Sequence, residues 1–206
     1  MSRPSSRSAA ALIVLCGAAV AACSSSSPAF TPTTSSAQLT VFPTKLFLGV
    51  DETGKALGSA PASIAGVSGA VTWTSASATV ATATGNATNG KVAGVKAGTT
   101  TVTIKSGTST ATIAVTVGTY AAAEATAGKT EYTTAKCDDC HAASGTDITP
   151  SDLGKHTDDQ ILAAVVDGTN PEGGAIEGMH KFTATKAIVA YLRSLPARND
   201  TPVEDK

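Results

Sequence analysis

Five consecutive residues, Cys137-Asp138-Asp139-Cys140-His141, carry two thiols and one imidazole within little more than one helical turn. Thiols three positions apart lie on the same side of a helix and can reach the two vinyl groups of one haem, while the next side chain directs an imidazole at the iron. C-x-x-C-H is the attachment signal for c-type haem. The motif predicts one covalently bound haem c, attached through Cys137 and Cys140 and ligated by His141.

Two other sites could use the same residues. A structural zinc ion needs four nitrogen or sulfur ligands, usually with a second closely spaced pair. His156 and His180 are too far apart for such a pair, and no cysteine is left over in this part of the chain. A thioredoxin-like dithiol needs a βαβ setting that the surrounding sequence does not offer. Haem is therefore the favoured hypothesis.

The second iron ligand is predicted to be Met179, the only methionine besides the initiator. It ends the glycine-rich segment 173–179, which can bend over a cofactor. A thioether opposite a histidine holds the iron six-coordinate and raises its potential. His180 and His156 are rival ligands, and His156 is interpreted as a surface or capping residue.

The N-terminal residues indicate export. Arg3 and Arg7 precede an uncharged apolar run that is too short to span a bilayer. The run closes on Val20-Ala21-Ala22-Cys23, which resembles a bacterial lipoprotein signal. This resemblance implies a signal peptide at 1–22, lipid on Cys23 and a location in the cell envelope, at the outer membrane on its periplasmic face or the cell surface. Residues 23–37 are rich in Ser, Thr and Pro and predict a flexible tether.

Residues 38–118 alternate apolar and polar side chains with a period of two, which predicts half-buried strands. Turns are expected where a glycine can adopt positive φ. These sites are Asn89-Gly90, Lys96-Ala97-Gly98 and Ser106-Gly107. Short strands at this spacing predict a β-sandwich. The apolar pairs that carry the pattern are Leu39/Val41, Val71/Trp73, Val102/Ile104 and Ile113/Val115/Val117.

This stretch resembles a bacterial immunoglobulin-like domain of group 2 over Gln38 to Val117. The segments that carry the resemblance are 71–75, 80–82, 90–104 and 113–117. Trp73 is interpreted as a packing residue between the sheets rather than a ligand platform. From Ser59 to Gly118 there is no Asp, Glu, His or Cys. The region therefore has none of these side chains for acid–base catalysis, nucleophilic catalysis or metal binding. We expect it to be a spacer or docking module.

Residues 119–127 are expected to form a linker, 128–198 a helical domain and 199–206 a tail. Thr157-Asp158-Asp159-Gln160 is the pattern of a helix start, and Gly168 is expected to end that helix. A second helix is predicted from Thr183 to Leu195, before Pro196. The chain from Gly128 onward holds 13 acidic and eight basic residues, a net charge of −5.

Gly128 to Leu195 resembles a small class I cytochrome c. The resemblance rests on Gly128, Tyr132, the C-x-x-C-H motif, Pro150, Leu153, Asp167-Gly168, Gly178-Met179 and 190–195. It implies thioethers at Cys137 and Cys140, iron ligation by His141 and Met179, and a Pro150 carbonyl that orients His141. The expected fold class is multidomain, an all-β immunoglobulin-like sandwich followed by an all-α cytochrome c domain.

These observations predict a membrane-anchored monohaem c-type cytochrome that carries single electrons and is not an enzyme. Expected partners are redox proteins with a basic docking surface and, through the lipid, a membrane. The 15 basic and 16 acidic residues of the whole chain argue against nucleic acid. Two alternatives remain open: a haem enzyme or sensor of peroxidase type, and a surface adhesion protein with an accessory haem domain.

Overall fold

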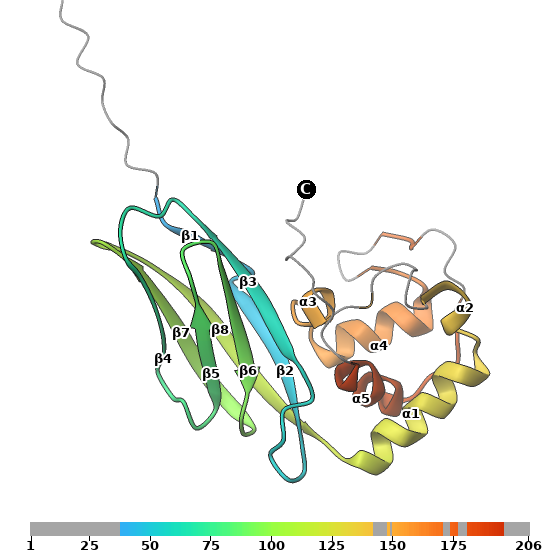
Figure 1. The fold of residues 1–206 in the computed structure, drawn as a ribbon. Helices are drawn as coiled ribbons and strands as arrows, with labels where there is room; N and C mark the ends of the chain where they lie inside the picture. Colours follow the sequence, from blue (N-terminus) through green and yellow to red (C-terminus); the bar gives the residue numbers. More distant parts are fainter. Residues whose placement is uncertain (1–37, 142–147, 149, 171–173, 177–180, 196–206) are drawn as a thin grey trace, which may run out of the picture. The chain divides into compact units, whose positions relative to one another are not determined.

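The computed structural model describes residues 38–141, 148, 150–170, 174–176 and 181–195 (Figure 1). Within them, eight strands are followed by five helices. The strands are β1 (Thr40–Phe42), β2 (Lys45–Asp51), β3 (Ser59–Ala65), β4 (Val71–Ser75), β5 (Ala81–Gly85), β6 (Asn89–Gly94), β7 (Gly98–Ser106) and β8 (Ser109–Tyr120). The helices are α1 (Ala122–Thr134), α2 (Asp138–His141), α3 (Pro150–Leu153), α4 (Asp158–Asp167) and α5 (Lys186–Ser194).

The strands form two four-stranded sheets that confirm the predicted β-sandwich. Sheet A has the order β1-β3-β6-β5 and sheet B the order β2-β8-β7-β4. Strand β2 runs parallel to β8, and every other pairing between these strands is antiparallel. The longest pairing joins β7 to β8 around Gly107, whose φ of 58° accommodates the predicted hairpin turn.

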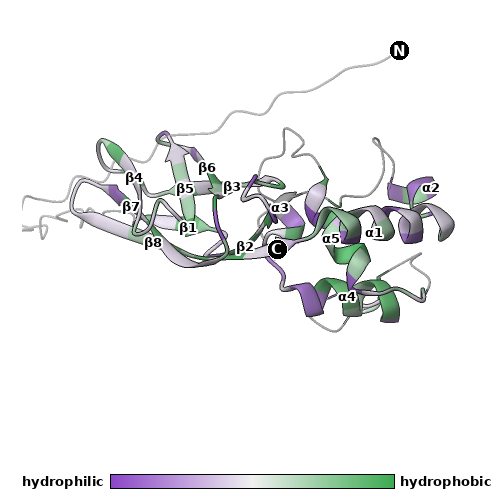
Figure 2. Ribbon diagram, turned by 90° about the horizontal axis from the view of Figure 1, so that it is seen from below, coloured by the Kyte–Doolittle hydropathy of each residue, from purple (hydrophilic) through white to green (hydrophobic). Residues whose placement is uncertain are grey.

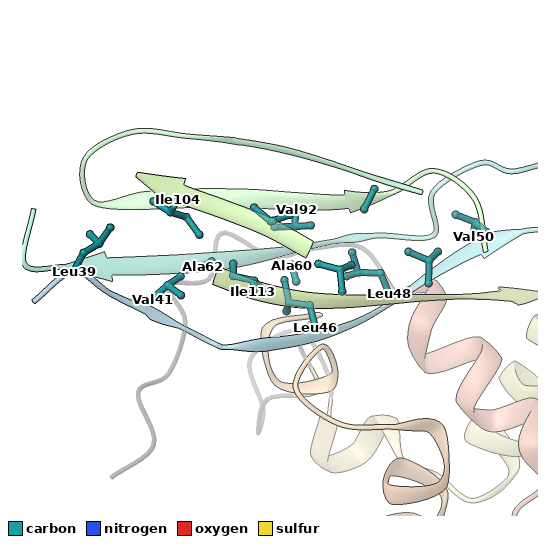
Figure 3. Packing of buried hydrophobic residues seen from close by; sticks show 14 residues of the cluster. Leu39, Val41, Leu46, Leu48, Val50, Ala60, Ala62, Val92, Ile104 and Ile113 are labelled. Carbon is teal, nitrogen blue, oxygen red and sulfur yellow. The ribbon is translucent and has the colours of Figure 1, made fainter. Parts of the chain in front are cut away.

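Both sheets contribute alternate side chains to one apolar core (Figure 3). Ile104 of β7 and Ile113 of β8 in sheet B, and Val92 of β6 in sheet A, are completely buried. Successive side chains of a strand point to opposite faces, so the period-two pattern places every second residue in this core. The other buried members are Leu39, Val41, Leu46, Leu48, Val50, Ala60, Ala62, Ala81, Val102, Val115 and Val117.

The turn expected at Asn89-Gly90 is not where the chain reverses, because both residues lie inside β6. The chain reverses just before them, where the side-chain oxygen of Asn86 accepts hydrogen bonds from the backbone N–H groups of Thr88 and Asn89. Gly90 instead pairs with Gly85 of β5. A Cβ on either glycine would overlap the indole of Trp73. The glycines are therefore required by packing rather than by a turn.

Trp73 is half-buried and packs against the sandwich core, as expected for a packing residue. Its Nε1–H donates to the backbone oxygen of Asn86 at 3.2 Å. The indole thus fastens β4 of sheet B to the β5–β6 hairpin of sheet A, which is a structural role.

The helices share a second apolar core, formed largely by α1, α4 and α5. Its buried members are Tyr132, Leu153, Ile161, Val165, Ile188, Val189 and Leu192. The predicted capping box of α4 is present: the Thr157 hydroxyl accepts from Gln160 N–H, and the Gln160 side chain accepts from Thr157 N–H. Gly168 ends α4 in the left-handed conformation with φ 67°. Helix α5 is capped by Thr185, two residues after the predicted start.

The all-α cytochrome c domain expected after the sandwich is not shown. Among the described residues, strands predominate, and two of the five helices, α2 and α3, contain only four residues each. Helix α1 begins at Ala122, inside the segment predicted as a linker, because β8 continues to Tyr120. In the described part of the chain, none of the helices has the length and apolar character needed to cross a membrane.

Candidate functional site

The C-x-x-C-H motif follows a sharply defined end of α1. Lys136 adopts the left-handed conformation with φ 55°. Its N–H donates to the Thr133 oxygen at 3.1 Å, and the N–H of Cys137 donates to the Tyr132 oxygen at 3.1 Å. These two bonds are a Schellman motif, in which a left-handed residue satisfies the last carbonyls of a helix and redirects the chain. The redirected chain enters α2 at Cys137.

The turn of α2 places both cysteines close to each other on a single helical turn. The N–H groups of Cys140 and His141 donate to the Cys137 oxygen at 3.3 and 2.8 Å. Both thiols are free in this structure. Cys137 is half-buried against the helical core, whereas Cys140 is exposed. Figure 2 shows α2 as largely hydrophilic.

Two tyrosines connect this turn to the longer helices. The Tyr132 hydroxyl of α1 donates to the backbone oxygen of His141 at 3.4 Å. The Tyr132 ring meets the Tyr191 ring of α5 edge to face, with centroids 5.1 Å apart. Helices α1 and α5 therefore hold the end of α2 in place, and they position the backbone that carries the imidazole.

The environment of Cys137 favours the neutral thiol. Burial raises the pKa of Cys137, and the nearby negative charge of Asp138 raises it further. A protonated thiol is a poor nucleophile and a poor redox centre. The surroundings of Cys137 thus differ from the electropositive setting that lowers the pKa of a reactive cysteine.

The described residues contain no group of three or more His, Cys, Asp and Glu side chains that could hold a metal ion. The two thiols and the imidazole on one turn fit the donor set that a covalently attached haem requires. Met179, its rival His180 and the lipid-bearing Cys23 lie outside the described residues. His156, another rival, stands directly before the N-cap of α4, and its backbone oxygen accepts from Arg193.

A second candidate site is a face that the sequence pattern did not single out. On the outer side of sheet B, strands β4, β7 and β8 align threonines in register across the strands, as in the row Thr74, Thr103 and Thr112. The residues of this threonine face are Thr72, Thr74, Thr99, Thr101, Thr103, Thr110, Thr112 and Thr116. All are exposed except the half-buried Thr103. The alternation that predicted the strands also assigns these residues to one face, because the register sets them side by side.

Arg193 and Asp158 form a polar cluster that the sequence analysis did not identify. Arg193 is buried at 7% exposure in α5, and its Nη2 lies 3.0 Å from the Asp158 carboxylate. The available signal was an arginine within the apolar pattern of the last helix. Such a residue is rarely buried unless it is paired.

The solved structures that are similar to this chain include domains of a surface layer protein. Domains 1–6 of the surface layer protein SbsC are 26% identical with a TM-score of 0.34, over 40% of this chain and 13% of that one. Domains 4 and 5 of SbsC give 26% identity and a TM-score of 0.33, over 39% of this chain and 44% of that one. The chain thus covers less than half the length of these matched chains. No family model matches the chain, and no curated protein matches it.

These findings correct the two family resemblances and the function derived from them. The assignment to a class I cytochrome c and the function of an electron carrier are wrong: strands predominate among the described residues, an all-α cytochrome domain is not shown, and no family model matches the chain. The β-sandwich is confirmed as a fold, but no family model supports its assignment to an immunoglobulin-like family. The expected redox partner depended on the electron-carrier function. A location in the cell envelope and lipid at Cys23 stay predictions from the N-terminal sequence.

Proposed function

We propose that this chain is a surface protein of the cell envelope, in which the sandwich makes adhesive contacts and the helical region carries an accessory haem. We also propose that it is not an enzyme. The observation that carries the adhesive part is the threonine face of sheet B. Between Ser59 and Gly118 the chain has no acidic, histidine or cysteine residue, so contact rather than catalysis is the chemistry available to this region.

The threonine face can bind an uncharged polar polymer, such as a cell-wall polysaccharide. Neighbouring strands lie about 4.8 Å apart, and alternate residues along a strand about 6.6 Å apart, which spreads the hydroxyls over a regular grid. Each hydroxyl both donates and accepts, and each methyl group offers a small apolar contact. On β4, β7 and β8 the only charge on this face is Lys105, so little charge has to be desolvated on binding.

The adhesive role is tested by binding the full-length protein to purified cell-wall polysaccharide. Thr101→Lys with Thr112→Lys places two charges on exposed positions of the central strands β7 and β8. We expect binding to fall at least tenfold. The matched control is Thr82→Lys with Thr84→Lys, two exposed threonines of β5 in sheet A. Equal binding by wild type and both double variants would contradict the adhesive role.

The haem part of the proposal rests on the turn of α2. Free Cys137 and Cys140 on one helical turn would form the two thioethers, and His141 would ligate the iron. The bound group would supply an iron centre held by the protein. Mass spectrometry of exported wild-type protein should show one covalently attached haem. Cys140→Ser should leave a single attachment and Cys137→Ser with Cys140→Ser none, whereas wild-type protein without haem would refute the cofactor.

Anchoring is proposed through lipid on Cys23. Three or more acyl-chain methylene groups already contribute a few kcal/mol, at about 0.8 kcal/mol each, so a full lipid holds the chain at the membrane. Wild-type protein should partition into the detergent phase, and Cys23→Ser should partition into the aqueous phase. Cys16→Ser is the control, since the proposed signal peptide would carry Cys16 away.

A further inference from the structure

Arg193 of α5 is buried, and all three nitrogens of its guanidinium are engaged. Nε and Nη2 donate to Oδ1 of Asp158 at 3.2 and 3.0 Å. Nη1 donates to the backbone oxygens of Leu153 and Phe47 at 2.6 and 2.9 Å, and Nη2 to that of His156 at 2.7 Å. Five donor contacts of this kind match the planar fork of arginine, and the single ammonium nitrogen of lysine could not reproduce all of them.

One of these acceptors belongs to the sandwich. Phe47 lies in β2, an edge strand of sheet B. Its oxygen accepts from Arg193, and its N–H donates to the backbone oxygen of Gly154 at 2.7 Å. Exposed backbone groups on an edge strand are a template for pairing with another chain. The helical region covers both backbone groups of this residue.

A residue of the sandwich also forms hydrogen bonds with Asp158. The hydroxyl of Tyr120, at the end of β8, lies 2.8 and 2.9 Å from the two carboxylate oxygens of Asp158 and donates to them. A Cβ on Gly49 would lie 2.9 Å from the Tyr120 ring, so the ring packs closely over this position of β2. Only Ala121 separates β8 from α1. The connection between the sandwich and the helices is therefore a single residue, which restricts their relative movement.

We propose that Arg193, Asp158 and Tyr120 form a joint that makes the sandwich and the helical region one cooperative folding unit. Opening the joint would leave the guanidinium and its carbonyl acceptors to water and would uncover the edge of β2 at Phe47. Unfolding of the helices would therefore destabilise the sandwich. The joint involves neither the haem motif nor the threonine face. A test of the joint therefore gives a result that does not depend on the proposed function.

Native-state hydrogen exchange of the full-length protein tests the joint. With Arg193→Lys, we expect the Phe47 amide to exchange at least tenfold faster than in wild type and thermal unfolding to separate into two transitions. Lys186→Met on the same helix is the control. The ion pair of Lys186 with Asp159 lies at the surface, because the two side chains are 81% and 88% exposed, respectively. The control should leave the exchange of Phe47 within twofold of wild type.

Arg193→Lys can disturb the helical core, so Tyr120→Phe provides a second test from the sandwich side. It removes one hydroxyl and leaves the ring over Gly49, and we expect Phe47 exchange to rise at least threefold. The proposal is overturned if both variants keep wild-type exchange at Phe47. It is also overturned if the helices of Arg193→Lys unfold while Phe47 protection and the sandwich transition remain those of wild type.

Discussion

Gly128 of α1 lies directly against the backbone oxygen of Ala187 in α5, in a space where no Cβ can be accommodated. The two helices make the most extensive contact between helices in the described part of the chain. Backbone approach of this kind is possible only where one helix presents a glycine. The pair fixes how α1, which leads into the C-x-x-C-H motif, packs on the last helix.

Replacing Gly128 should therefore destabilise the helical region. Gly128→Ala would force α1 and α5 apart, and we expect a loss of about 3 kcal/mol or more in the free energy of unfolding, despite the better helix propensity of alanine. Chemical denaturation followed by circular dichroism at helical wavelengths measures it. Ala127→Gly, on an exposed position of the same turn, is the control and should cost only about 1 kcal/mol.

The glycines beneath Trp73 make a second packing prediction. Gly90→Val would place a branched side chain where the indole lies, and we expect the sandwich to lose roughly 2–4 kcal/mol. Trp73 is the only tryptophan, so its fluorescence reports the unfolding directly. Thr84→Val on the neighbouring strand, at an exposed position, should change stability by less than about 1 kcal/mol. A wild-type midpoint for Gly90→Val would show that the indole does not lie over this residue.

Ionisation of Tyr120 should weaken the fold at high pH. Burial raises the pKa of Tyr120 from 10.0 to about 12, the Asp158 charge adds to the rise, and the Arg193 charge opposes it. The folded-state pKa exceeds the unfolded one, so the contribution to stability is complete below pH 10 and is lost between pH 10 and about 12. It should amount to roughly 1–2 kcal/mol, because the hydroxyl is partly accessible to water.

Urea unfolding at pH 8 to 11.5 tests this pH dependence in wild type and Tyr120→Phe. Lysines titrate in the same range in both proteins, so the difference between the two isolates Tyr120. The difference in unfolding free energy should shrink as the pH rises above 10. A difference independent of pH would contradict the assignment.

Lys136 offers a stabilising substitution next to the motif. Its φ of 55° is costly for a residue with a Cβ, and glycine adopts it without strain. Lys136→Gly should raise the free energy of unfolding of the helical region by about 0.5–1 kcal/mol, while Lys136→Val should lower it. Calorimetry of both variants measures the change in stability. An equal loss of stability in both would argue against the left-handed conformation at Lys136.

The sequence by itself determined the local elements whose signals are contained in neighbouring residues. The alternation of Ile113, Val115 and Val117 placed β8, and the Thr157–Gln160 box and Gly168 placed both ends of α4. Strands β3 and β5 lack this signal, because alanines, serines and threonines fill them, and only pairing with β6 makes them strands. The spacing of Cys137, Cys140 and His141 likewise came from the chain alone, since one helical turn sets it.

Only the tertiary structure decided the relationships between distant residues. The sequence predicts a turn at Gly90, whereas the structure shows that Trp73 of the other sheet occupies the space above both Gly90 and Gly85. Arg193 lies within the last predicted helix, and its burial follows from acceptors contributed by β2, α3 and the start of α4. Such contacts depend on the packing of separate elements, for which a period along one segment contains no information. The family resemblances failed for the related reason that short motifs constrain a site more than they constrain the fold around it.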